Sequence, residues 1–220
     1  IEPNPSVETV REAIALGREH GSEFLLAVGG GSVIDGTKLI AVGLLYDGDP
    51  WEIVLKGQAD KTVPLGTVLT MSATGSEMNN GSVISCHETK EKFPFNGDYP
   101  LFSILDPSLV LAAAEADRLR LGRHLRACAG AIYDYARAVA PDGSLGRRHF
   151  ADARRDRTRN PQEPARLRLM ADFMLSATMG LNGFIAMGVA QDWATHMIGH
   201  ELRPCTALRT DRPSWSYSRP

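Results

Sequence analysis

Three consecutive glycines followed by a serine are the first residues in this chain whose types and spacing suggest chemistry. Gly29, Gly30, Gly31 and Ser32 lie between an apolar run, Phe24–Val28, and a run of small residues typical of a helix. Without Cβ atoms, the backbone can approach a diphosphate, and Ser32 can cap a helix whose N-terminal N–H groups and dipole favour an anion. The same residues would also form a tight turn without ligand. The segment therefore predicts either a bare strand-to-helix turn or a phosphate site.

A second turn of small, hydroxyl-bearing residues follows a second apolar run. Residues 63–70 predict a strand, which leads into Met71-Ser72-Ala73-Thr74-Gly75-Ser76-Glu77. In a parallel sheet both turns emerge at the carboxyl edge, where α/β folds place nucleotides. The hydroxyl groups of Thr70, Thr74 and Ser76 then bind phosphate or ribose, or alternatively cap the segment that follows. Two such turns predict a nucleotide site more strongly than one.

Two histidines near the end of the chain have the spacing of a shared ligand. His196 and His200 lie four residues apart in a segment with a helical pattern, so both imidazoles share one helix face. A lone buried histidine is usually structural, but this pair predicts a metal site. Histidine binds several divalent ions, and the pair does not choose among them.

The elements that must position these residues alternate between helix and strand. Val10, Ile14 and Gly17 share one face of a predicted helix that begins near Ser6, its candidate N-cap. The helix leads into the apolar run at 24–28, whose length and two-sided hydrophobicity are typical of a buried parallel strand.

Further elements continue this alternation. A second helix is expected at about 33–45, and two more strands at 82–85 and 102–107. Lys92, in a polar turn at 88–92, faces either a bound anion or solvent. The order of elements predicts an α/β domain with a partial parallel sheet.

Composition argues against several classes of partner. The 220 residues carry 24 Lys and Arg against 26 Asp and Glu, a formal net charge of −2 without a basic block, which argues against nucleic acid or an anionic membrane. No apolar run reaches membrane-spanning length, and the start at Ile1 has neither an initiator Met nor a signal-peptide pattern. Three unevenly spaced cysteines favour a reducing compartment. We therefore expect a cytoplasmic protein, cut at its front.

Three motifs in the first half resemble the iron-containing (group III) alcohol dehydrogenases. They are Ala27–Lys38, Leu69–Glu77 and Leu105-Asp106-Pro107, in the order of that family. A fourth motif, Gln191–Leu202, contains the histidine pair. The similarity is nearest to the butanol dehydrogenase and NADPH-dependent aldehyde reductase branch.

The resemblance implies a fold like that of dehydroquinate synthase. A partial dinucleotide-binding α/β domain is expected at 1–112, and a partial all-α metal-binding domain at 113–220. The implied reaction is hydride transfer between NAD(P)H and a short- to medium-chain aldehyde or alcohol, polarised by Fe²⁺ or Zn²⁺. The intact family protein is expected to be a homodimer. Neither NAD versus NADP nor iron versus zinc follows from these residues.

The resemblance also implies roles for individual residues. The expected pyrophosphate contacts are Gly29, Gly30, Gly31 and Ser32. The further expected cofactor contacts are Asp35, Thr70, Met71, Thr74, Ser76 and Lys92. Asp35 and Lys38 would also support the start of the helix. His196 matches a metal ligand, and His200 matches a histidine beside the nicotinamide that is assigned to proton relay.

The metal-binding half departs from the family pattern. The family uses one Asp and three His as ligands. Counting from Asp106, the first two should fall near His124 and Cys128, and the last at Thr210, fourteen residues after His196. Three of the four ligands are therefore missing.

The missing ligands fall in two stretches, 117–167 and 203–220, that lack a helical pattern. A solvated loop or disorder is one interpretation. Another is that both stretches are translated out of frame: a shifted frame over 135–152 permits a segment resembling the family's helix, and the opposite shift restores histidines near Thr210. Between the stretches, the chain from about Leu169 to Leu202 has a helical pattern. Uninterrupted gene reads in the present frame would contradict the frameshift hypothesis.

The sequence is consistent with two functions, one enzymatic and one limited to binding. The first is a metal- and NAD(P)-dependent alcohol dehydrogenase or aldehyde reductase acting on a small molecule. The alternative is a non-catalytic nucleotide-binding remnant, because His196 alone cannot hold a catalytic metal. The literal 220-residue chain is expected to be inactive.

Overall fold

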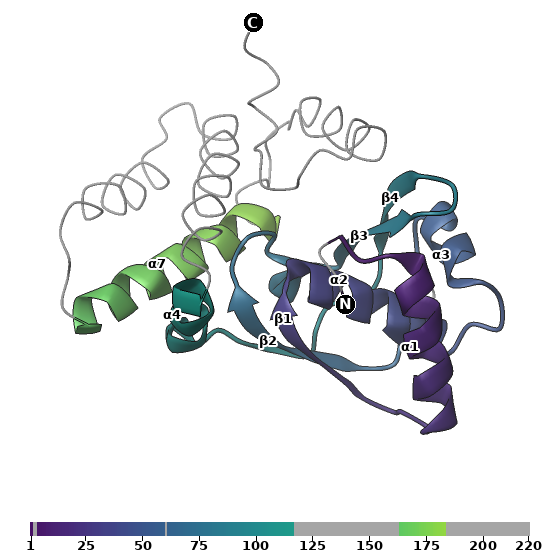
Figure 1. Cartoon of the computed structure of the whole chain (residues 1–220), viewed down its shortest axis with the longest axis horizontal. Coiled ribbons are helices and arrows are strands. Elements are labelled where there is room, and N and C mark those ends of the chain that lie inside the picture. The colour runs from purple at the N-terminus through teal and green to yellow at the C-terminus, as the bar shows by residue number, and fades with distance from the viewer. Residues whose placement is uncertain (2–3, 60, 117–162, 184–220) are drawn as a thin grey trace, which may run out of the picture. The chain divides into compact units, whose positions relative to one another are not determined.

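The computed structural model describes residues 1, 4–59, 61–116 and 163–183 of the 220-residue chain (Figure 1). These residues belong to two compact units. The first comprises Ile1–Leu69 and Ser76–Ile104, and the second comprises Thr70–Gly75 and the chain from Leu105 onward. The described part contains no helix long and apolar enough to cross a membrane.

The first unit contains a short sheet with helices and a hairpin. Its elements in chain order are α1 (Val7–Glu19), β1 (Leu25–Gly30), α2 (Gly31–Gly43), α3 (Pro50–Lys56), β2 (Leu65–Met71), the 3₁₀ turn η1 (Ser76–Met78), β3 (Gly81–Cys86), β4 (Glu91–Asn96) and β5 (Phe102–Ile104). The last two residues of β2 group with the second unit. The sheet has the order β1-β2-β5, and β2 pairs with β5 in parallel, with Gly66 opposite Phe102. The predicted partial parallel sheet is therefore confirmed.

Helix α1 begins where its sequence predicts. The hydroxyl oxygen of Ser6 accepts a hydrogen bond from the Thr9 backbone N–H, as an N-cap does. Val7, Val10 and Ile14 are buried on one face. Gly43 lets α2 approach that face closely, since a Cβ there would overlap the Ile14 side chain. The apolar core of the unit forms around this contact, from Val7, Val10, Ile14, Leu39, Ile40, Val42, Trp51, Ile53, Val54, Ile84, Cys86 and Phe95.

Strand β1 is buried on one face, whereas its sequence predicts burial on both. Ala27 and Gly29 are buried, but Leu26 and Val28 are 53% and 56% exposed. Helix α2 contacts β1 and, in the described structure, covers the face that carries Ala27. Phe24 lies on the open face and stacks on Phe102, with ring centroids 6.1 Å apart.

The predicted polar turn at 88–92 is confirmed at 88–90, where it joins β3 to β4 in a hairpin. β4 begins at Glu91, so Lys92 lies in a strand and not in a polar turn. The chain reverses over residues 87–90, where Lys90 has a φ of 58°. Pro94 within the strand hides the signal of β4, because proline is usually absent from strand interiors.

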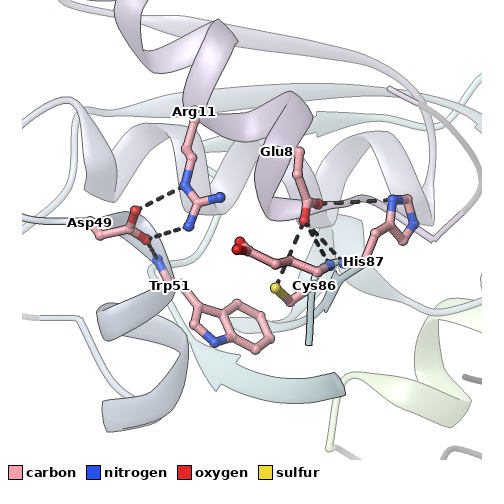
Figure 2. A network of polar contacts seen from close by, with 7 residues as sticks. Glu8, Arg11, Asp49, Trp51, Cys86 and His87 are labelled. Carbon is pink, nitrogen blue, oxygen red and sulfur yellow. Dashed lines mark hydrogen bonds and ion pairs between the residues drawn. The ribbon is translucent and has the colours of Figure 1, made fainter. Parts of the chain in front are cut away.

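A surface network of polar side chains joins α1 to its neighbours (Figure 2). Glu8 Oε1 accepts hydrogen bonds from the backbone N–H groups of His87 and Glu88 at 3.0 and 3.4 Å. Arg11 donates two hydrogen bonds to Asp49, which also caps α3 by accepting from the Trp51 N–H. Both links tie α1 to a loop end that would otherwise leave backbone N–H groups without acceptors.

The described part of the second unit contains two helices, α4 (Pro107–Ala116) and α7 (Glu163–Leu181), which contact each other. Asp106 begins α4 by accepting hydrogen bonds from Ser108. Met170, Met174 and Ala177 are buried on α7. The stretch at 117–167 had two interpretations, a loop or disorder and translation out of frame; its last residues, 163–167, belong to α7, which does not agree with a loop there. The rest of that stretch, and 203–220, lie outside the described residues.

Candidate functional site

The triglycine turn joins β1 directly to α2. β1 ends at Gly30, which is also the N-cap of α2, and Gly31 is the first helical residue. Gly30 provides no side-chain cap, and the first N–H groups of a helix have no intrahelical acceptor. The predicted role of Ser32 as N-cap is wrong, because the helix starts before it. Its Oγ instead accepts a hydrogen bond from the Asn4 N–H at 3.3 Å.

Gly29 leaves room that a larger residue would fill. A Cβ at this position would lie 2.5 Å from Val33 Cγ2 and 2.7 Å from Val33 Cβ. The end of β1 therefore lies so close to the Val33 side chain of α2 that position 29 requires glycine. The helix N-terminus is consequently bordered by bare backbone, which an anion can approach.

Lys92 and Ser32 contact the same residue, Asn4. Lys92 Nζ donates to Asn4 Oδ1 at 2.8 Å, while the Asn4 N–H donates to Ser32 Oγ. Asn4 has a φ of 61°, a left-handed conformation that asparagine adopts more readily than most residues. This contact brings the predicted cation to the turn at the start of α2, from a strand 60 residues away in sequence.

Asp35 and Ser76, both predicted cofactor contacts, bind each other. Ser76 Oγ donates to Asp35 Oδ1 at 2.5 Å, and the Val83 N–H donates to Asp35 Oδ2 at 3.1 Å. Burial raises the pKa of Asp35, although the Ser76 hydrogen bond and the nearby Lys38 ammonium oppose that shift. Ser76 is only 1% exposed. These internal partners support a role in holding α2, and contact of either side chain with a nucleotide remains a prediction.

Lys38 is completely buried next to that pair. Its Nζ donates to Ser76 Oγ at 3.0 Å, to Gly81 O at 2.8 Å, and to both the backbone and side-chain oxygens of Asn79 at 2.7 and 3.2 Å. Burial lowers the pKa of Lys38 to about 8, although the carboxylates of Asp35 and Glu77 favour its charged form. A buried cation therefore links the second turn of α2 to the segment between β2 and β3.

The turn after β2 is described within the second unit. Thr70 and Met71 are half-buried and Thr74 is exposed. Ser72 is 5% exposed, and in the described part of the chain its Oγ finds no hydrogen-bond partner. A buried hydroxyl without a partner is rare, and either an ordered water or a ligand would satisfy it.

The predicted metal residues, His196 and His200, lie outside the described residues. Among the residues that are described, no group of three or more His, Cys, Asp or Glu could hold a metal ion.

The sequence did not predict two residues of the candidate site, Asn4 and Ser72, or the contacts of a third, Lys38. Asn4 had a signal, since asparagine between two prolines favours a turn. Ser72 lay within a run of hydroxyl residues and had no feature that separated it from them. Lys38 was expected near the helix start, but its buried contacts depend on residues about 40 positions later, which no local pattern reveals.

Comparisons with known proteins identify the family that this chain resembles. The sequence profile of a family described as "Iron-containing alcohol dehydrogenase" matches residues 1–107. The chain is 42% identical over 210 residues to the probable NADH-dependent butanol dehydrogenase 1 of Bacillus subtilis (strain 168), covering 92% of this chain and 53% of that protein. It is 41% identical over 213 residues to the NADPH-dependent aldehyde reductase YqhD of Escherichia coli (strain K12), covering 92% and 54%.

Solved structures give the same relationship. A crystal structure of E. coli K-12 YqhD aligns with a TM-score of 0.79 at 38% identity, covering 94% of this chain and 55% of that one. NADH-dependent butanol dehydrogenase A from Thermotoga maritima aligns with a TM-score of 0.79 at 32% identity, covering 94% and 53%. The chain thus spans about half the length of the curated relatives that it matches.

Proposed function

This chain belongs to the iron-containing alcohol dehydrogenase family, and from that membership we propose that it supplies the nucleotide-binding portion of an NAD(P)H-dependent alcohol dehydrogenase or aldehyde reductase. The proposed substrate is a short- to medium-chain aldehyde or alcohol. The names of the relatives carry both NADH and NADPH, so the proposal covers either nucleotide. The family description names iron, and the proposed metal is a divalent ion, Fe²⁺ or Zn²⁺.

The observation that carries the proposal is the bare start of α2. Gly29 fits only as glycine against Val33, and the helix begins at Gly31 without a side-chain cap. A pyrophosphate can therefore accept hydrogen bonds from the N–H groups of the first helical turn, where the helix dipole favours negative charge. Lys92, held by Asn4, adds a cation near the same turn.

The residues of the second turn, which belong to the second unit, are proposed as nucleotide contacts in their own right. Ser72 Oγ is buried and finds no acceptor or donor among the described residues, so it fits a ligand hydroxyl or phosphate oxygen. Thr70, Met71 and Thr74 remain proposed contacts on the strength of their place in the same motif. When bound, the reduced nicotinamide supplies the hydride. The described residues bind and orient the nucleotide.

The proposed metal site rests on the sequence alone. His196 is the proposed ligand and His200 the proposed proton relay, and the described residues include no metal site to test against them. We therefore assign no step to the metal. A fold like that of dehydroquinate synthase, a homodimer and a cytoplasmic location complete the proposal.

Resequencing the gene and testing its full-length product would test this function. The purified protein should bind NADH or NADPH, contain iron or zinc, and reduce butyraldehyde. Removing the metal with a chelator should abolish turnover but leave nucleotide binding within about twofold, and adding back Fe²⁺ or Zn²⁺ should restore the rate. A protein that binds nucleotide but holds no metal and reduces butyraldehyde at background would overturn the enzymatic proposal.

A further inference from the structure

Lys38 makes an unusual set of contacts for a helical lysine. It is completely buried, and its ammonium group lies within hydrogen-bonding distance of four oxygen atoms, on Ser76, Asn79 and Gly81. Burying a charge is unfavourable unless it is paired and hydrogen-bonded. Here the backbone oxygens of Asn79 and Gly81 also depend on this cation, so the helix and the facing segment require each other.

Asp35 extends the same link toward the start of the helix. It lies one turn nearer the N-terminus of α2, and its carboxylate accepts from Ser76 Oγ and from the Val83 N–H. Ser82 Oγ donates to the Asp35 backbone oxygen at 2.8 Å. The Ser76 hydroxyl thus accepts from Lys38 and donates to Asp35, which joins a cation and an anion of one helix through a residue of η1.

We propose that Lys38, acting through Ser76 and Asp35, is a positioning residue that holds the first turn of α2 in the geometry that binds the nucleotide pyrophosphate. This inference rests on the proposed function of that turn. Lys38 does not contact the nucleotide in this arrangement. It fixes residues 76–83 against the first two turns of the helix, and thereby fixes the direction of the N–H groups at Gly31 and Ser32.

The link has the rigidity that positioning requires. The Lys38 and Ser76 side chains are buried, and their partners Asp35, Asn79 and Gly81 are half-buried. Water therefore has limited access to the link, and a lowered local dielectric strengthens its hydrogen bonds. An uncharged side chain of similar size at position 38 would remove the hydrogen bonds that Lys38 donates to Asn79 and Gly81. The segment would then shift to find water, and the start of α2 would lose its support.

The test compares Lys38→Met with Val54→Ala, a core variant expected to lose a similar free energy of unfolding. NADH and NADPH dissociation constants are measured at pH 7 by nucleotide fluorescence for the 220-residue chain, for Lys38→Met and for Val54→Ala, a buried truncation on α3. We expect Lys38→Met to weaken binding at least tenfold, and Val54→Ala to leave it within about twofold at a similar melting temperature. Equal dissociation constants in the two variants would overturn the positioning role.

A double-mutant cycle shows whether the effect passes through Ser76. If it does, Ser76→Ala and Lys38→Met weaken binding individually, and the double variant weakens it by clearly less than the product of the two factors. Independent effects that multiply would contradict the proposed route.

Hydrogen–deuterium exchange separates this inference from the proposed function. If the wild-type chain binds neither nucleotide, the proposed function of the turn fails for this chain. The positioning role then stands only if Lys38→Met raises exchange specifically at residues 31–38 and 76–83 relative to Val54→Ala. A uniform rise across the first unit would overturn it.

Discussion

Arg11 and Asp49 face each other through two parallel hydrogen bonds, from Nε to Oδ2 at 2.9 Å and from Nη2 to Oδ1 at 3.1 Å. Asp49 also accepts from the Trp51 N–H at 2.7 Å, so one carboxylate both pairs with α1 and caps α3. Burial alone would raise the pKa of Asp49, but the hydrogen bonds from Arg11 and Trp51 outweigh it and lower that pKa. The pair is partly exposed, at 37% and 40%, and solvent weakens it accordingly.

Asp49 both caps α3 and pairs with Arg11, so its removal should lower stability more than removal of the ion pair alone. We expect Asp49→Ala to lower the free energy of unfolding by about 1–2 kcal/mol, since a cap is lost, and Arg11→Met by less than about 1 kcal/mol. Because the folded pKa of Asp49 is depressed, its contribution is present above about pH 4 and is lost as the pH falls through the folded pKa. Urea unfolding at pH 7 and pH 3 would measure both effects. The control is Asp47→Ala, which removes an exposed carboxylate in the same loop. An equal loss in its free energy of unfolding would contradict the capping role of Asp49.

The stability of the first unit should rise with pH above about 8. Lys38 has a folded pKa of about 8 against an ordinary value of 10.5, with Asp35 of α2 and Glu77 of η1 facing it. Between these two values the unfolded chain binds a proton that the folded chain has released, so stability increases by roughly 1 kcal/mol per pH unit. Urea unfolding at pH 7 to 10 should show the rise in the wild type and not in Lys38→Met. A constant difference in stability between the two proteins across that range would disprove the assignment.

Gly29→Ala should disturb the turn by steric overlap. The new methyl group would lie 2.5 Å from Val33 Cγ2, which forces either the strand or the helix to move. We expect a loss of about 1–3 kcal/mol in the free energy of unfolding, as for other overpacked sites, together with weaker NADH binding. The double variant Gly29→Ala with Val33→Ala makes room for the methyl group and should recover part of both losses. If Val33→Ala instead increases both losses, steric overlap with Val33 is not their cause.

Ser72→Ala should separate stability from binding. The Ser72 hydroxyl is buried without a partner among the described residues, so its removal should leave the melting temperature unchanged or raise it. The same substitution should weaken NADH or NADPH binding about tenfold or more if the nucleotide satisfies that hydroxyl. Differential scanning fluorimetry and fluorescence titration measure the two effects. Unchanged binding together with a lower melting temperature would show that Ser72 has a structural partner instead.

Local patterns were sufficient to predict the elements around the triglycine turn. The apolar run before Gly29 and the small residues after it predicted β1 and α2, and Ser6 predicted the start of α1. The helix began two residues earlier than expected, because Gly30 can cap it through its backbone conformation without a side-chain oxygen.

Features that depend on distant partners were not predicted. β4 was missed because Pro94 interrupts its pattern, and its pairing with β3 overrides that local preference. The internal contacts of Asp35 and Ser76 were missed for a similar reason. Each residue is polar and lies near a turn, and only the folded chain brings 35 and 76 within hydrogen-bonding distance.

The open face of the β1-β2-β5 sheet favours self-association of this chain at high concentration. Phe24, Leu26, Val28, Phe102 and Ile104 are each 44–56% exposed, and all lie on β1 and β5 or beside them. Exposed apolar side chains on a sheet favour self-association, and a net charge of only −2 provides little repulsion to oppose it. Purified preparations should therefore be handled dilute and at a pH away from the isoelectric point near 6.3.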